Sequence, residues 1–565
     1  MRILGIGAFH SDAAAALIDG DRVVAASSEG AFSRLPHDPA FPIRAIRFCL
    51  QHGGVVARDL DRVVFYEKPL RKFERVLATQ MQAFPRSARS FARSAFAWLG
   101  DRLWIKHHIA RQLAVEQSRI VFTEQASAAA TYAFATSPFE AAAVLVVDDA
   151  AEWATTTIGR AGPEGLELLW ESRFPHSLGY VASAITQYLG FVPGADEGLV
   201  EALGAHGTPC YAGVLGELVP SVGGGFTVCQ RSFRFGFDSD RLFDAALVEQ
   251  LGPARNPGEA LLGGASGGTR HADIAASLQV VLEERVLELA RATHRRVPVD
   301  DLCLSGALAR NSRVLARLRG EGPFRRVHSP PVPGKAGAAI GCALYALHAD
   351  RGTLVRSIGH AIGEPVDDRA EDGASPLPEG VTAPAALLQR LLAGERVAWV
   401  RGRMEFGPHS WGHRSLFASA RGQLARSALL AAVQHVESFA PCRLALPRAA
   451  AAEFVEMDGV LGAPGGPLRL KARDALRDAA PSAIEPDDTV WLHLVDPQDD
   501  PDLHSILVAI GEQQGLPALL HADFALRGAS IVRSEVEAVD AFRRSALDAL
   551  VVQSRVYEAA GRRAT

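Results

Sequence analysis

The chain contains few lysines and no basic tract. Of its 59 basic residues only five are lysine, and the 565 residues carry a formal charge of −5. Proteins that bind nucleic acid or anionic membranes electrostatically present clustered positive charge. The sequence therefore predicts no nucleic-acid partner and no membrane surface as partner.

Paired cysteines are also missing. The six cysteines are scattered, none lies in a Cys-x-x-Cys pair, and Cys303 is enclosed by Leu302 and Leu304 in an apolar run. Zinc knuckles and disulfide frameworks require closely spaced or paired cysteines, so neither is expected. The thiols are typical of a reduced, cytoplasmic protein.

Long uninterrupted apolar runs are absent as well. The longest apolar region, Ala126 to Val147, is broken by Pro138 and Glu140, whereas a helix that spans a bilayer needs about 20 apolar residues. The first residues lead directly into a strand pattern and do not resemble a signal peptide. No tandem repeat with a period of roughly 20–50 residues is found, which excludes solenoids and propellers.

The sequence does contain an alternation of strand and helix patterns along its whole length. Single hydrophobic cores stop growing at about 250–300 residues, so at least two domains are expected. The stretch 363–383 is acidic, proline-rich and aperiodic, and it predicts a linker between domains spanning 1–362 and 384–565. Both domains are predicted to be α/β layers, the second smaller than the first.

Polar residues follow two predicted strands of the first domain. Asp148 ends the apolar strand 143–148, while Gly306 and Asn311 follow the strand 302–304. The carboxyl ends of strands form the ligand crevice in α/β folds, so these residues are candidates for a site. A tight strand-to-helix turn explains Gly306 equally well.

Eight short strings occur in the order in which one known family has them. The most specific reads Arg-Gly-Arg-Met-Glu-Phe-Gly-Pro, because it joins charged residues to a backbone-exposing glycine in one run. Together they closely resemble the carbamoyltransferase family that decorates nodulation factors, cephamycins and aminoglycosides. The strings are His10–Leu17, Phe65–Pro69, Lys72–Arg75, Ser137–Phe139, Glu152–Thr156, Phe174–Gly179, Ser183–Phe191 and Arg401–Pro408.

This resemblance implies a fold and a reaction. The N-terminal domain would be of the actin and sugar-kinase type, similar to the tRNA threonylcarbamoyl-transfer protein. The C-terminal domain would be similar to the threonylcarbamoyl-AMP synthase, and would make carbamoyl-adenylate from carbamoyl phosphate and ATP. The first domain would then pass the carbamoyl group to an alcohol. The negative charge that develops when the alcohol oxygen attacks the carbonyl carbon would be stabilised.

The family's metal site is largely replaced. The positions of its two helical histidines hold Gln125 and Ala129, and the position of its aspartate near the end of the first domain holds Lys335. Of that set only Asp148 remains, and one carboxylate rarely holds a metal alone. The sequence therefore predicts that no metal is bound.

The resemblance also assigns site residues. His10 and Asp12 would lie near the acceptor, with Asp148 as a residual acid. In the C-terminal motif His409 replaces an arginine that could contact phosphate, and Asp523 adds a negative charge. The nucleotide-binding candidates that remain are Gly306, Asn311, Arg403, Glu405, Gly407 and Arg414.

Two main functions stay open, beside a third in which the chain is a repurposed nucleotide-dependent ligase, because loss of the metal need not abolish adenylate formation. The chain is an enzyme of natural-product tailoring that carbamoylates a small-molecule acceptor from ATP and carbamoyl phosphate, or it is an inactive partner of an intact paralogous subunit. A dimer is compatible with both. Turnover that depends on carbamoyl phosphate would favour the first, and co-purification with a complete paralogue would favour the second.

Overall fold

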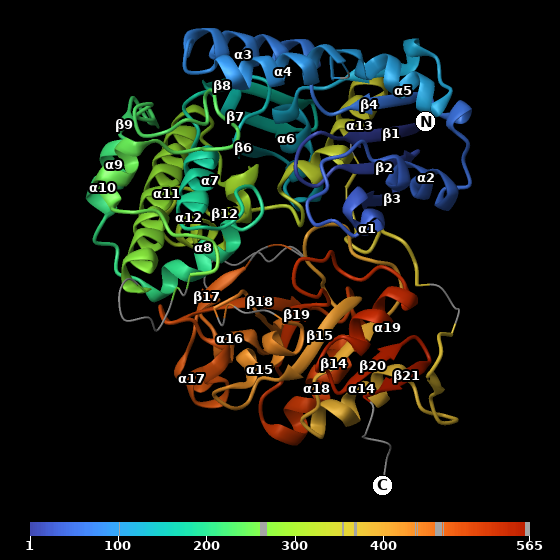
Figure 1. Cartoon of the computed structure of the whole chain (residues 1–565). Coiled ribbons are helices and arrows are strands. Elements are labelled where there is room, and N and C mark those ends of the chain that lie inside the picture. Colours follow the sequence, from blue (N-terminus) through green and yellow to red (C-terminus); the bar gives the residue numbers. More distant parts are fainter. Residues whose placement is uncertain are drawn as a thin grey trace. The chain divides into compact units, whose positions relative to one another are not determined.

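The computed structural model describes residues 1–100, 102–259, 261, 268–352, 355–356, 358–366, 370–434, 437, 439–457, 466 and 468–559. The chain divides into two compact units. The first comprises Met1–Val24 and Pro39–Ile358, and the second comprises Ala25–Asp38 and Gly359–Thr565. The fold is mixed α/β, as the sequence predicts (Figure 1).

Two five-stranded sheets repeat one topology, and their strands lie in the first unit except for residues 25–28 at the end of the strand 22–28. In each, the first strand pairs antiparallel with the second and parallel with the fourth, and the fourth pairs parallel with the fifth. This duplicated order, third-second-first-fourth-fifth, agrees with the predicted actin and sugar-kinase type. The first sheet contains β1 (Arg2–Gly7), β2 (Ala14–Asp19), β3 (Arg22–Ser28), β4 (Arg62–Phe65) and β5 (Ile120–Phe122). The second contains β6 (Ala142–Val147), β7 (Ala154–Gly162), β8 (Gly165–Arg173), β11 (Asp301–Ser305) and β12 (Arg326–His328).

Two helices rich in small residues pack against the strands of the two sheets. Helix α6 (Gln125–Thr136) is buried along almost its whole length, and α13 (Lys335–Arg351) contacts both α6 and β1. A Cβ on Gly341 would lie 1.9 Å from the carbonyl oxygen of Ala128, and one on Gly5 would lie 1.9 Å from that of Ala339. The close backbone approach therefore requires glycine at both positions.

The other helices of the first unit cover the sheets and form its periphery (Figure 1). The long helix α11 packs against α12 and β6. These helices are α2 (Ile43–His52), α3 (Pro69–Gln82), α4 (Ala88–Gly100), α5 (Ile105–Leu113), α7 (Leu178–Tyr188), α8 (Glu197–Leu203), α9 (Ala212–Leu218), α10 (Ala245–Leu251), α11 (Gly268–Arg296) and α12 (Ser312–Glu321). A short hairpin joins β9 (Ser221–Val222) to β10 (Gly225–Phe226).

One nine-stranded sheet forms the second unit, in the order β13-β21-β20-β14-β15-β19-β16-β18-β17. Successive residues of its inner strand β14 face opposite cores: Val397 and Trp399 pack in one apolar cluster, Ala398 and Val400 in the other. The strands are β13 (Ser375–Pro376), β14 (Val397–Val400), β15 (Arg414–Ser419), β16 (Arg443–Pro447), β17 (Arg469–Lys471), β18 (Thr489–Val495), β19 (Leu519–Asp523), β20 (Ala549–Val552) and β21 (Arg555–Glu558). Its helices are α1 (Glu29–Ser33), α14 (Ala383–Leu392), α15 (Ala425–Ala432), α16 (Ala451–Phe454), α17 (Asp474–Ala479), α18 (Pro501–Gln514) and α19 (Glu535–Arg543).

The division of the chain differs from the sequence prediction in two places. Residues 25–38, predicted within the domain 1–362, belong to the second unit. Within the predicted linker 363–383, β13 pairs antiparallel with β21, and the side chain of Thr382 caps α14. Backbone pairing with a strand far along the chain leaves no periodic apolar signal in so short a segment.

Candidate functional site

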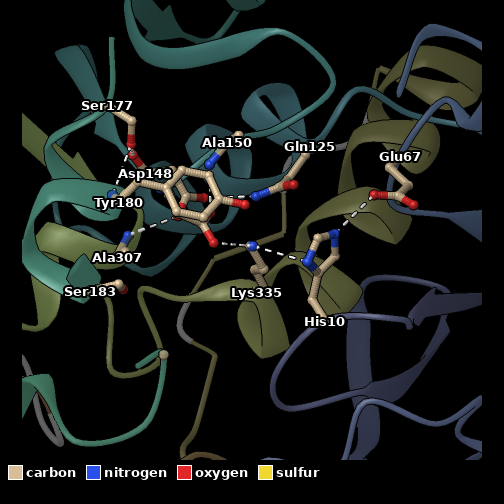
Figure 2. A network of polar contacts seen from close by, with 12 residues as sticks. His10, Glu67, Gln125, Asp148, Ala150, Ser177, Tyr180, Ser183, Ala307 and Lys335 are labelled. Carbon is tan, nitrogen blue, oxygen red and sulfur yellow. Dashed lines mark hydrogen bonds and ion pairs between the residues drawn. The ribbon is translucent and has the colours of Figure 1, made fainter. Parts of the chain in front are cut away.

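A cluster of polar side chains lies beyond the carboxyl ends of β1, β4 and β6 in the first unit (Figure 2). It draws on the segments that follow β1, β4 and β6, on the first residues of α6 and α13, and on α3. We call this set the polar cluster; its members are His10, Glu67, Lys72, Gln125, Asp148, Asp149, Glu152 and Lys335.

Three hydrogen-bond donors surround the Asp148 carboxylate in the polar cluster. It accepts hydrogen bonds from the Gln125 amide (2.7 Å), the Asp149 backbone N–H (2.9 Å) and the Ala307 backbone N–H (3.3 Å). Burial, and then the neighbouring charge of Asp149, raise the pKa of Asp148 to about 6. A carboxyl group with this pKa can take up a proton near neutral pH.

The turn after β11 brings the Ala307 N–H to Asp148. Gly306 has a φ of 90°, and a Cβ there would lie 2.4 Å from the carbonyl oxygen of Val147. Only glycine fits this turn, which places β11 close against the end of β6. Gly306, predicted as a nucleotide-binding residue, therefore shapes the surroundings of Asp148.

His10, Glu67 and Lys72 form one side of the polar cluster. His10 Nε2 lies 3.3 Å from Glu67 Oε2, and Lys72 Nζ donates to the same oxygen at 2.6 Å. Burial, followed by the charges of Lys335 and Lys72, lowers the pKa of His10 to about 3, so its ring is neutral at neutral pH. Burial would raise the pKa of Glu67, but the Lys72 ammonium holds it well below the usual range.

Lys335 and Asp149 form the other side. Lys335 Nζ donates to Asp149 Oδ2 at 2.7 Å and to His10 Nδ1 at 3.2 Å. Burial would raise the pKa of Asp149, yet the Lys335 ammonium holds it well below its usual range. Two adjacent aspartates thus have opposite pKa shifts, a pattern found where acid and base roles are divided.

Glu152 completes the cluster at the start of α6. Its carboxylate accepts from the backbone N–H groups of Lys68 (2.8 Å) and Gln125 (3.3 Å). Burial raises the pKa of Glu152 to about 7. Sequence analysis did not select Glu67, Lys72, Asp149 or Glu152 as site residues. Glu67 follows β4 as Asp148 follows β6, and this repeated placement is the signal that could have found it.

The remaining predicted site residues of the first unit are Asp12 and Asn311. Asp12 has a φ of 64° in the turn between β1 and β2, two residues after His10. Asn311 caps α12 by accepting from the Val314 N–H at 3.0 Å, and its amide exchanges hydrogen bonds with that of Gln279. Asn311 thus has a helix-capping role in this structure.

The residues of the second unit that are predicted to bind nucleotide hold the loop between β14 and β15 in place. Arg414 is fully buried and donates to the carbonyl oxygens of His413 (3.0 Å) and Arg533 (3.1 Å). Glu405 accepts from the N–H groups of Trp411 (2.6 Å) and His413 (2.7 Å). Arg403 donates to the Gly363 carbonyl at 3.0 Å, and Gly407 has a φ of 130°.

Asp523 at the end of β19 is surrounded by donors. Its carboxylate accepts from the Ser410 N–H (2.7 Å) and hydroxyl (2.9 Å), and from Arg443 (2.6 Å), while His409 Nδ1 lies 3.0 Å away. Burial would raise the pKa of Asp523, but Arg443 holds it well below its usual range. These donors are therefore already hydrogen-bonded to a carboxylate of the protein itself.

Comparison with known proteins assigns the chain to a family. A model of the carbamoyltransferase N-terminus matches residues 2–344, and one of the carbamoyltransferase C-terminus matches residues 388–559. The chain belongs to the carbamoyltransferase family. The resemblance seen in the eight strings is thereby confirmed.

Curated relatives of this carbamoyltransferase-family chain agree over most of its length. The uncharacterised protein sll1178 of Synechocystis sp. is 30% identical, over 98% of this chain and 96% of its own. Nodulation protein NolNO of Sinorhizobium fredii is 26% identical, over 97% of this chain and 78% of its own. Among solved structures, HypF of T. kodakarensis aligns with 62% of this chain and 48% of its own, at 14% identity and a TM-score of 0.32.

The residues that the family resemblance places at metal positions do not suit a metal ion. Gln125 directs its amide N–H₂ at Asp148, and Lys335 directs its ammonium at Asp149. Both groups are donors, and an ammonium repels a cation. Ala129 carries no ligand. Throughout the described part of the chain, no group of three or more His, Cys, Asp or Glu side chains could hold a metal.

Nor does the described part of this carbamoyltransferase-family chain contain a helix with the length and apolar character that crossing a membrane requires.

Proposed function

We propose that this protein transfers a carbamoyl group from carbamoyl-adenylate to the hydroxyl group of a small-molecule acceptor, at the polar cluster of the first unit. Carbamoyl phosphate and ATP are the proposed sources of the adenylate. Membership of the carbamoyltransferase family supports the reaction type. The acceptor is proposed only as an alcohol, because this is the nucleophile that the family resemblance implies.

Asp148 is the observation that carries the proposal. It is a buried carboxylate with a pKa of about 6, set among three donors at the carboxyl end of β6. Deprotonated Asp148 can accept a proton at neutral pH, and its donors keep the carboxylate oriented. Next to Asp148, the Lys335 ammonium contacts both the Asp149 carboxylate and neutral His10.

The proposed step balances as an acyl transfer. The acceptor oxygen attacks the carbonyl carbon, and a new carbon–oxygen bond forms. The bond from that carbon to the adenylate oxygen breaks, and AMP leaves with the electron pair. The proton of the acceptor hydroxyl passes to Asp148, and positive groups of the polar cluster stabilise the developing oxyanion.

Transfer of labelled carbamoyl phosphate tests this proposal. Purified protein is incubated with ¹⁴C-carbamoyl phosphate, ATP and a panel of sugar and polyol acceptors, and both AMP and labelled product are measured. We expect both products with the wild type, and we expect Asp148→Asn to lose the labelled product. Asp19→Asn is the matched control, since Asp19 pairs with Arg2 at a solvent-accessible site. Absence of AMP and of labelled product with every acceptor would contradict the proposal.

The second unit supports a different function. Arg414 and Arg403 donate to backbone carbonyl groups, and Asp523 occupies Arg443 and His409. Arg403 and Arg414 are the predicted nucleotide-binding cations, and both are already engaged by carbonyl groups of the chain itself. The second candidate function is therefore a partner subunit that makes no adenylate itself and works beside an intact paralogue.

Nucleotide binding separates the two functions. Isothermal titration of ATP into the purified protein gives a saturable signal if the second unit makes adenylate. An absent signal, together with co-purification of a tagged complete paralogue, favours the partner subunit. Transfer that proceeds from supplied carbamoyl-adenylate but not from ATP would assign chemistry to the first unit alone.

A further inference from the structure

Two adjacent carboxylates, one buried and one partly exposed, follow β6 and concentrate negative charge there. Asp148 is 5% exposed (Figure 2), and the Asp149 side chain, which is 27% exposed, accepts a hydrogen bond from Lys335 Nζ. Each raises the cost of ionising the other, because like charges a few ångströms apart repel strongly where water is excluded. A pair of this kind is a common way to hold a divalent cation.

Lys335 supplies that charge from within the chain. Its side chain is only 8% exposed, and its Nζ donates to Asp149 Oδ2 at 2.7 Å and to His10 Nδ1 at 3.2 Å. Lys335 Nζ contacts Nδ1 of the neutral His10 ring and Lys72 Nζ contacts its Nε2, so the ring is held between two ammonium groups.

The position of Lys335 in its helix is a second, independent observation. It is the first residue of α13, directly after the N-cap Gly334. A positive charge in the first turn opposes the helix dipole and is unfavourable there. The helix alone therefore disfavours a lysine at this position, and the carboxylates that it meets account for it.

We propose that the Lys335 ammonium is the permanent cation of the polar cluster, in the place of a divalent metal ion, and that it positions Asp149 and His10. The polar cluster then operates without a metal. The role of Lys335 in positioning Asp149 and His10 for catalysis rests on the proposed function. Its role as the cation of the polar cluster does not depend on turnover.

Manganese titration tests the claim directly. Mn²⁺ prefers carboxylate oxygens, so it reports on an unneutralised aspartate pair. The wild type is expected to show no saturable Mn²⁺ binding by isothermal titration. Lys335→Ala should gain Mn²⁺ affinity of at least about tenfold over the wild type, because two carboxylates lose their counter-charge. Adding Asp149→Asn to Lys335→Ala should abolish the gain.

Two further variants serve as controls. Lys471→Ala removes an exposed lysine of the second unit and should leave Mn²⁺ binding unchanged. If Lys335→Ala fails to fold, Lys335→Gln keeps a hydrogen-bond donor for Asp149 without the charge, and the same gain is expected. A folded variant of either kind without Mn²⁺ affinity would overturn the inference.

The outcomes also separate this inference from the proposed function. Stoichiometric metal in the wild type, or loss of carbamoyl transfer on treatment with EDTA, overturns the inference and leaves the function standing. Metal-free wild type, a gain of Mn²⁺ affinity in Lys335→Ala and no carbamoyl transfer would support the inference and contradict the function.

Discussion

At the scale of single residues, the polar cluster divides its carboxyl groups into two kinds. Asp149 and Glu67 each contact a buried lysine, and their pKa values are held low against the effect of burial. Asp148 and Glu152 accept from amide groups instead, and burial dominates, so their pKa values are raised. The direct contact with a lysine decides which carboxyl group holds a proton near neutral pH.

The pH dependence of carbamoyl transfer should follow Asp148. A proton acceptor must be ionised, and with a pKa of about 6 the rate should rise between pH 5 and pH 7. Asp148→Asn should lower the rate by about 10²- to 10⁴-fold and flatten this rise. Initial rates of labelled transfer across that range measure both effects. A rise that persists in Asp148→Asn would assign it to another group.

Glu152 should make the free energy of unfolding fall as pH rises, whereas a carboxylate paired with a cation makes it increase. Its folded pKa of about 7 lies above the unfolded value near 4.5, so the folded protein holds the proton more tightly. Stability then falls as pH rises through this interval, by up to about 1.4 kcal/mol per pH unit. Glu152→Gln removes this loss and still accepts from the N–H groups of Lys68 and Gln125.

Urea denaturation of wild type and Glu152→Gln at pH 5 and pH 8 measures this effect. The variant should gain stability over the wild type at pH 8, and the gain should be much smaller at pH 5. Asp19→Asn, a change at a partly exposed carboxylate, should show no such dependence. A gain in Glu152→Gln that is equal at both pH values would mean that packing, and not ionisation, is responsible.

At the scale of elements, glycines set how closely α13 approaches its neighbours. Gly341 faces the backbone of α6, where a Cβ would lie 1.9 Å from the Ala128 carbonyl oxygen. α6 and α13 begin with Gln125 and Lys335, so their packing also positions two members of the polar cluster. A change in this contact should therefore reach the site.

Gly341→Ala should destabilise the protein by about 1–3 kcal/mol, because two helix backbones must separate. Gly320→Ala is the matched control. Gly320 also lies in a helix, and a Cβ there meets no atom within 4 Å. Its substitution should be neutral or should stabilise by about 0.5–1 kcal/mol through helix propensity. Urea denaturation measures both, and equal effects would contradict the packing argument.

The elements were predictable where the pattern is local. The predicted apolar strand 143–148 agrees with β6 to within one residue at each end. The pairing of β13 with β21 was not predictable, because two exposed residues carry no periodicity. In the polar cluster, Asp148 was selected from its place after a strand, whereas Lys72 lies within a helix pattern that gives no hint of its partner Glu67.

At the scale of the whole molecule, the chain order and the division into units do not coincide. Residues 25–38 belong to the second unit although they come from the first tenth of the sequence. Arg34 fastens this segment to the rest of that unit. Its guanidinium donates to the carbonyl oxygens of Ser530 (2.7 Å) and Ile531 (2.6 Å), and lies 3.1 Å from Glu537. Three contacts on one side chain join positions about 500 residues apart.

Arg34→Met should loosen the second unit locally and leave the first unit unchanged. The substitution keeps an apolar stem and removes every charged contact, so two carbonyl groups lose their donor. Hydrogen–deuterium exchange should become faster around residues 530–537 and stay the same in α13. Arg58→Met, at a side chain that is 85% exposed, is the matched control and should change neither region. Unchanged exchange at 530–537 in Arg34→Met would mean that the apolar contacts of segment 25–38, and not Arg34, hold it in the second unit.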